Sequence, residues 1–108
     1  MGEDEGSPNP KELLLQAAEA KRYKNTLDLH GLDVEAAGVR IDQYLYGQFT
    51  AGQRFCRIMH GKGTGKLRQS TLDLLAGHPL VEAFRSSTRP EEQGAVIYVV
   101  LQENVSEH

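Results

Sequence analysis

The sequence predicts an α/β protein: a two-layer β-α-β-α-β-β sandwich with a mixed four-stranded sheet, preceded by one additional N-terminal helix. Apolar residues alternate or run together over four short segments, as they do in strands, and recur at helical spacing over three longer ones. A helix separates the first two strands, so these strands should lie parallel, joined by a right-handed crossover. A chain of 108 residues is long enough for one domain with one core.

The N-terminal quarter of the chain falls into two parts. Residues 1–9 are acidic and polar, with no apolar residue after the first, and predict a disordered leader. Residues 10–24 change to strong helix formers with leucine and alanine along one stripe, which predicts a short amphipathic helix. The sequence leaves open whether this segment, which we extend to residue 25, docks on the domain or links it to a longer parent chain.

The first strand and its helix come next. The strand is expected at residues 26–30, where two leucines on one face alternate with Asp28 and His30 on the other. Asp33 is a natural N-cap for the helix that follows, whose apolar face continues until Gly52 and its polar neighbours end it.

The second half of the domain adds three strands and one helix. A strand at residues 55–59 leads through a glycine-rich turn into a helix that ends near residue 76, with Gly77 at its C′ position and Pro79 preventing continuation. Residues 80–87 form a weaker strand. A polar loop then leads to the strongest strand, residues 95–101, whose two apolar faces should make it central in the sheet and covered on both sides. The domain should therefore span residues 26–103, followed by a frayed tail at 104–108.

The turn at residues 60–68 has the chemistry of an anion site. A glycine-rich turn between a strand and a helix leaves backbone N–H groups unpaired, with the positive end of the helix dipole behind them. The alternative is a tight turn whose glycines serve only positive φ. Five basic residues and no acidic one between positions 54 and 68 favour the anion site. The residues expected to bind phosphate or nucleic acid are Arg57, Gly61, Lys62, Gly63, Thr64, Gly65, Lys66 and Arg68.

Spacing and composition exclude several classes of protein. The turn is not a Walker A loop, because four residues after Gly61 lead to Lys66 instead of glycine, and Leu67 replaces the Ser or Thr that would hold Mg²⁺. A net charge of −3 argues against a polycation that coats nucleic acid. Cys56 is the single cysteine, so no disulfide can form within the chain. With no signal peptide and no apolar stretch of membrane-spanning length, we expect a cytoplasmic protein that binds no membrane.

Three candidate catalytic residues should meet at one edge of the sheet. His30 closes the first strand and His60 the second, and open α/β sheets bind ligands at the carboxyl ends of their strands. Singly, each has a simpler explanation: Asp28 could bond a backbone N–H or hold His30 in one tautomer, and both histidines could be structural. Jointly, two histidines beside a phosphate cradle favour a function for Asp28, His30 and His60.

The chemistry that such a group could perform is phosphodiester cleavage. A neutral histidine can accept a proton from water or a ribose 2′-OH, and a protonated one can donate to the leaving oxygen. Asp28 can orient an imidazole and raise its basicity, while N–H groups, Lys62 and Arg68 stabilise the phosphoryl oxygens. The carboxylate cluster of a two-metal nuclease is missing. A single Mg²⁺ or Mn²⁺ ion held by Asp28 and a substrate phosphate stays open, and no other cofactor is implied.

The paired motifs resemble those of a known family. Leu-Asp-Leu-His-Gly at residues 27–31, followed by His-Gly-Lys-Gly-Thr-Gly-Lys-Leu-Arg at residues 60–68, resembles the Smr domain, the small MutS-related module that occurs alone and at the C-terminus of MutS-like proteins. The resemblance covers roughly residues 26–102, and His78-Pro79 with Val81 also matches the family's typical segment. The family often shows several glycines before the last strand, where this chain has only Gln93-Gly94-Ala95, which weakens the case that this loop contributes to the site.

The resemblance implies a fold like that of the C-terminal domain of the third translation initiation factor, and nicking of DNA, often branched, or of RNA in some members. It assigns catalysis to Asp28 and His30, and substrate contact to residues 60–63. The first hypothesis is therefore a monomeric endonuclease acting on DNA or structured RNA. The second is a non-catalytic nucleic-acid-binding module that targets a DNA repair, recombination or ribosome-associated protein, and a purely structural role in protein interaction is a third.

Overall fold

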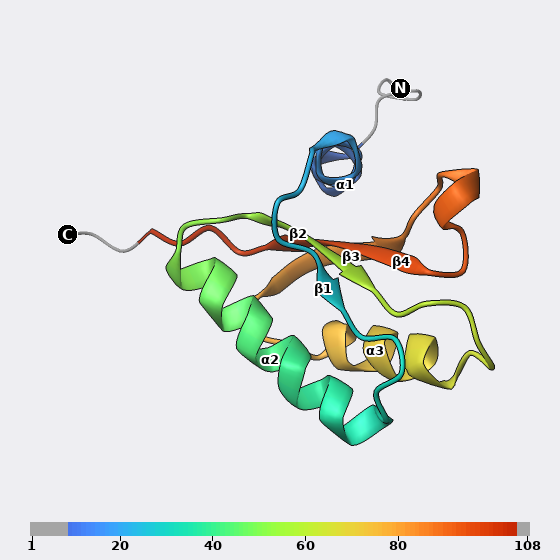
Figure 1. The fold of residues 1–108 in the computed structure, drawn as a ribbon. Coiled ribbons are helices and arrows are strands. Elements are labelled where there is room, and N and C mark those ends of the chain that lie inside the picture. Colours follow the sequence, from blue (N-terminus) through green and yellow to red (C-terminus); the bar gives the residue numbers. More distant parts are fainter. Residues whose placement is uncertain (1–8, 106–108) are drawn as a thin grey trace.

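A computed structural model describes residues 9–105. The expected leader at 1–8 and the expected tail at 106–108 lie outside the described residues. The elements follow in the predicted order (Figure 1): α1 (Pro10–Ala20), β1 (Leu27–Asp28), α2 (Val34–Thr50), β2 (Phe55–Met59), α3 (Lys66–Ala76), β3 (Val81–Ser86), the short 3-10 helix η1 (Pro90–Glu92) and β4 (Val96–Leu101).

The four strands form one mixed sheet in the order β1-β2-β4-β3. β1 and β2 are parallel, as the connecting helix α2 requires, and β4 runs antiparallel to both β2 and β3. All six residues of β4 are buried. The prediction that the most apolar strand is central in the sheet is therefore confirmed.

Helices cover both faces of this sheet (Figure 1): α2 and α3 lie on one side and α1 on the other. Ile97, Val99 and Leu101 of β4 pack with α2 and α3, whereas the alternating residues Val96, Tyr98 and Val100 pack with α1. The predicted two layers hold for residues 27–101, and α1 adds a third. The question left open by the sequence is thus answered, because α1 docks on the domain and covers the second apolar face of β4.

Side-chain caps fix the starts of the first two helices. Asp33 Oδ1 accepts a hydrogen bond from the N–H of Ala36 at 2.7 Å, which confirms the predicted N-cap of α2. Asn9, expected in the leader, caps α1 through a 2.8 Å bond from the N–H of Glu12. At the end of α3, Gly77 is the C-cap itself, with φ −107°, so the expected C′ position was one residue off.

The β1 strand is shorter than expected, but its pairing with β2 continues past its last residue. Asp28 lies opposite Met59 in the parallel register, and the N–H of Leu29 donates to the carbonyl of Met59 at 2.8 Å. This bond carries the chain to the point where β2 also ends, so the next residue, His30, emerges beside the glycine-rich turn.

Between residues 9 and 105, no helix combines the length and apolar character needed to cross a membrane.

Candidate functional site

A cleft of about 480 Å³ lies at the carboxyl ends of β1 and β2, and we call it the glycine-loop cleft. Its lining comes from the two strand ends, the turn between β2 and α3, and the loop before β4. No carboxylate is among the described residues that line it. The lining residues are His30, Gly31, His60, Gly61, Lys62, Gly63, Thr64, Gly65, Leu67, Arg68 and Gly94.

The two motifs touch at Gly61. A Cβ atom added to this residue would lie 3.2 Å from the Cβ of His30, closer than side chains normally approach, and Gly61 has φ +79°. Glycine suits both constraints best, because a positive φ disfavours any other residue and an added methyl group would require His30 to shift. The predicted meeting of the two strand ends is therefore confirmed.

We expect Gly61→Ala to reduce the free energy of unfolding by about 1–2 kcal/mol, the cost of a left-handed conformation for a residue with a Cβ. It should also displace His30, because the new methyl group would press on its Cβ. Urea denaturation measures the first effect, with Gly63→Ala as the matched stability control: its φ is not positive and nothing lies within 4 Å of the added Cβ. Equal midpoints for the two variants would contradict this account.

Asp28 and His30 form a pair at the mouth of the cleft. The His30 Nδ1 atom lies 2.8 Å from Asp28 Oδ1, and the same oxygen accepts the backbone N–H of His30 at 3.1 Å. These bonds lower the pKa of Asp28, and the bond from Asp28 raises the pKa of His30. Because an ionised carboxylate only accepts hydrogen bonds, Nδ1 carries a proton, which leaves Nε2 of His30 as the atom that gains or loses one. The side chain of His30 is 75% exposed, so that atom can meet a substrate.

His60 differs from His30 in almost every respect. Only 4% of its surface is exposed, and its Nδ1 lies 2.8 Å from the carbonyl oxygen of Gly61, so Nδ1 carries the proton. Burial lowers the pKa of His60, and the nearby positive charge of Arg68 lowers it further, against the opposing effect of the Gly61 carbonyl. Nε2 is buried and has no hydrogen-bond partner among the described residues. The structure therefore favours a neutral His60 and leaves the protonated role to His30.

We expect His60 to make the protein less stable in mild acid. Its folded pKa lies below the ordinary value of about 6.5, so its contribution to stability is complete above that pH. As the pH falls below about 6.5, the unfolded chain takes up a proton that the folded protein takes up only at lower pH, and stability declines. Urea midpoints between pH 8 and pH 5 should fall less in His60→Gln than in the native protein. Parallel curves for the two proteins would refute this role.

The glycine loop leaves the first turn of α3 open to an anion. Gly65, with φ +95°, is the N-cap residue, and it has no side chain to bond the first amides of the helix. Thr64 Oγ1 accepts only a long 3.4 Å bond from the N–H of Lys66. Lys62 and Lys66 are exposed, and Arg68 is half-buried with its guanidinium 3.3 Å from Ser86 Oγ. Lys66 is beside the cleft but is not part of its lining.

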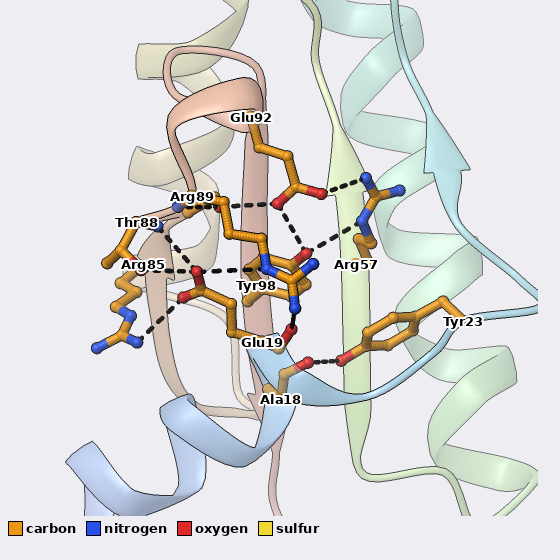
Figure 2. Close-up of polar contacts among 10 residues, drawn as sticks. Ala18, Glu19, Tyr23, Arg57, Arg85, Thr88, Arg89, Glu92 and Tyr98 are labelled. Carbon is orange, nitrogen blue, oxygen red and sulfur yellow. Dashed lines mark hydrogen bonds and ion pairs between the residues drawn. The ribbon is translucent and has the colours of Figure 1, made fainter.

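The structure does not bring Arg57 to this loop. Residues alternate along β2: Cys56 and Ile58 face α2 and α3, and Arg57 faces the side of α1. Its guanidinium donates to Tyr98 and Glu92 (Figure 2), and also to Thr26. The expectation that Arg57 would join the phosphate site is therefore corrected, because a neighbour in sequence points to the opposite face of a strand.

One residue that sequence reasoning discounted also lines the cleft. Gly94, with φ +80°, follows η1 and lies in the loop before β4. The carbonyl of the next residue, Ala95, accepts the backbone N–H groups of His60 and Gly61 at 2.8 and 3.2 Å. A short loop with a single glycine thus reaches the site, although its shortage of glycines had weakened the case for including it.

The side chains at this edge do not fit a protein-held metal centre. Within residues 9–105, no three or more His, Cys, Asp or Glu side chains gather closely enough to hold a metal ion. Asp28 is the one carboxylate in the pair at the cleft, and its Oδ1 is already engaged by His30. Mg²⁺ is commonly bound by one or two carboxylates together with substrate phosphates and water, so a single Mg²⁺ or Mn²⁺ ion between Asp28 and a substrate phosphate stays a prediction.

Comparisons with known proteins agree with this geometry. The chain matches the Smr domain family over residues 27–102. It is 44% identical over 73 residues to a protein named endonuclease MutS2 from Caldicellulosiruptor saccharolyticus, a match that covers 67% of this chain and 9% of the relative. A MutS2 endonuclease from Clostridium botulinum is 40% identical over 65 residues, which is 60% of this chain and 8% of the relative. The chain thus corresponds to about a tenth of the length of these relatives.

Two solved structures are also similar. The Smr domain of Thermus thermophilus MutS2 is 38% identical, with a TM-score of 0.68 over 72% of this chain and 98% of the other. YdaL, a stand-alone small MutS-related protein from Escherichia coli, has a TM-score of 0.76 over 92% of this chain and 79% of the other, and at 22% identity it supports the fold alone. The segment matched by the family model shows that this chain belongs to the Smr domain family.

Proposed function

We propose that this domain binds nucleic acid and nicks its phosphodiester backbone. The observation that carries the proposal is the exposed Asp28–His30 pair at the mouth of a cleft that is lined by helix-terminal amides, Lys62 and Arg68 and by no described carboxylate. Anionic ligands suit such a lining. The names of the MutS2 relatives point the same way.

The proposed chemistry needs one proton-transfer group and one electrostatic cradle. The oxygen of water or of a ribose 2′-OH forms a bond to phosphorus while the bond from phosphorus to the leaving ribose oxygen breaks. His30 gives its Nε2 proton to that leaving oxygen, and the proton of the attacking oxygen passes to solvent. The loop amides, Lys62 and Arg68 stabilise the negative charge on the phosphoryl oxygens.

Asp28 and His60 act through other groups. Asp28 keeps the proton of His30 on Nδ1 and raises the pKa of the ring, so that a larger fraction of His30 is imidazolium at a given pH. His60 donates to the carbonyl of Gly61 and so fixes the turn that approaches His30. It is a positioning residue, whereas His30 is the catalytic one.

A nicking assay tests the proposal. Supercoiled plasmid and structured RNA are each incubated with the native protein and with His30→Ala, with and without EDTA. Strand breaks that require His30 support the proposal, and comparison of the two substrates separates DNA from RNA cleavage. Loss of nicking in EDTA would indicate a divalent ion held by Asp28 and a substrate phosphate, and survival of nicking would indicate proton transfer without one. Identical background with both proteins would end the catalytic proposal.

The second candidate function is a non-catalytic nucleic-acid-binding module. It is favoured by the burial of His60, which leaves only one of the two histidines accessible. This candidate expects salt-sensitive binding that Lys62→Ala or Lys66→Ala weakens, without strand breaks. Tighter binding to branched than to linear duplex would indicate a junction-directed role for either candidate.

A further inference from the structure

The basic residues of this protein are not spread evenly. All twelve are described, and four of them, Arg54, Arg57, Arg85 and Arg89, form ion pairs with described carboxylates. Six of the other eight fall into two groups. The loop cluster is Lys62, Lys66 and Arg68, beside the site already described, and the connection cluster is Lys21, Arg22 and Lys24, between α1 and β1. Lys11 and Arg40 are the two outside both groups.

The connection cluster borders two adjoining clefts. Lys21 and Arg22 line both a cleft of about 410 Å³ and a second cleft of about 340 Å³, and Lys24 lines the second. The single carboxylate in these linings is Glu92. It already accepts hydrogen bonds from Arg57 and Tyr98 (Figure 2) and from Ser87. Among the described residues that line the two clefts, no other carboxylate is present to neutralise the cluster.

The end of α1 holds this connection in place. Arg89 donates to the carbonyl oxygen of Glu19 at 2.6 Å, and Tyr23 donates through its hydroxyl group to the carbonyl of Ala18 (Figure 2). The ammonium group of Lys21 lies 5.1 Å from the centre of the Tyr23 ring. These contacts fix the backbone that carries the three exposed basic side chains, so less conformational entropy is lost on binding than for charges on a free chain.

The larger cleft and the catalytic pair share one face of the sheet. Asp28 lies opposite Met59, and Met59 packs with the apolar residues of α1. Thr26 precedes Asp28 by two residues in the chain and so has the same orientation. Its hydroxyl oxygen accepts a hydrogen bond from Arg57, and both residues line the larger cleft. Six residues lead from Lys24 to His30, and Leu27 and Asp28 are in β1. The Cα atoms of Lys24 and His30 are therefore at most about 20 Å apart, a span of no more than about six phosphates along one duplex strand.

We propose that the connection cluster is a second contact surface for the nucleic-acid backbone, so that one strand runs from Lys21, Arg22 and Lys24 across β1 to His30 and the glycine loop. This inference rests on the proposed function, since it extends the substrate track of the same site. In this proposal the α1–β1 connection, which lies outside the two family motifs, binds phosphates upstream or downstream of the one that reacts.

Salt-dependent binding tests the inference. Fluorescence anisotropy measures the affinity for labelled duplexes of different lengths between 50 and 300 mM salt, for the native protein, Lys21→Gln/Arg22→Gln/Lys24→Gln and Lys62→Gln/Lys66→Gln. The double variant Lys11→Gln/Arg40→Gln is the matched control, because these are the two basic residues outside both clusters that form no ion pair with a described residue. The slope of log K against log[salt] is negative, and its magnitude should fall by roughly 2–3 in the triple variant, about 0.9 for each lost phosphate contact, and stay unchanged in the control.

The triple variant should also lose the gain in affinity that the native protein shows on longer duplexes. A slope equal to that of the control would overturn the second contact surface, even if Lys62→Gln/Lys66→Gln still weakens binding and nicking persists. Loss of slope in the triple variant, combined with no nicking by the native protein, would support the surface and refute only the catalytic proposal. Failure of the native protein to bind any duplex would overturn both.

Discussion

Replacing His30 with alanine should slow strand nicking by about 10²–10⁴-fold, the usual contribution of a positioned proton-transfer group. Binding should change little, because the loop amides and lysines that hold the phosphate remain. The fold should also be unaffected, since the imidazole is 75% exposed, and substitutions at such positions usually alter stability by less than about 0.5 kcal/mol. Single-turnover nicking rates and equilibrium binding, measured on the same substrate, separate these effects.

The pH dependence of nicking identifies the role of the neighbouring carboxylate. Asp28 raises the pKa of His30, so Asp28→Asn should let the imidazolium lose its proton at lower pH. If His30 donates a proton, the alkaline limb of the rate profile moves to lower pH in this variant. Asp42→Asn is the matched control, because Asp42 Oδ1 pairs with His78 Nε2 at 2.9 Å and neither residue lines the glycine-loop cleft. An unshifted limb in Asp28→Asn would remove Asp28 from the mechanism.

The largest loss of stability is expected from Glu19→Ala. Only 7% of Glu19 is exposed, and its carboxylate accepts bonds from Arg85 Nη2 at 3.1 Å, from the hydroxyl of Thr88 at 2.6 Å and from the N–H of Thr88 at 3.2 Å. Removing one partner of a buried charged network leaves the others unpaired, which should cost about 2–4 kcal/mol. Glu35→Ala, an exposed glutamate in the first turn of α2, is the control in urea denaturation at pH 7.

Acid titration checks the same network independently. Burial raises the pKa of Glu19, but the bonds from Thr88 and Arg85 outweigh that effect, so the net pKa lies below its ordinary value. Its stabilising contribution is therefore present above about pH 4.3, the value for an unfolded glutamate, and is lost as the pH falls through the folded pKa. Glu19→Gln should lose less stability than the native protein over that range. A native-like midpoint for Glu19→Ala at pH 7 would show that the network does not hold α1.

Much of the fold was predictable because local chemistry specified it. The alternation around Asp28 placed the first strand, the carboxylate of Asp33 marked the start of α2, and the unbroken apolar run of β4 showed that both of its faces needed cover. The meeting of His30 with the glycine-rich turn could also be anticipated, since a parallel crossover brings two strand ends to one edge whatever the details of packing.

What the sequence did not yield depends on contacts between distant residues. Glu19 bonds Arg85 and Thr88, 66 and 69 positions away, and no local pattern announces such pairs. The protonation state of His60 follows from its burial, which only the assembled sheet and loops determine. Arg57 was misplaced because counting charges along a segment ignores which face of a strand each residue occupies.

The third layer has a practical consequence for anyone trimming this domain. The family match begins at residue 27, after α1 has ended. A fragment cut at that boundary would leave Val96, Tyr98 and Val100 without the helix that covers them. Exposed hydrophobic patches of this kind promote self-association. Expression trials should therefore begin at Asn9 or earlier. Aggregation of a shorter fragment would reflect the loss of the apolar face of α1 and not an intrinsic tendency to oligomerise.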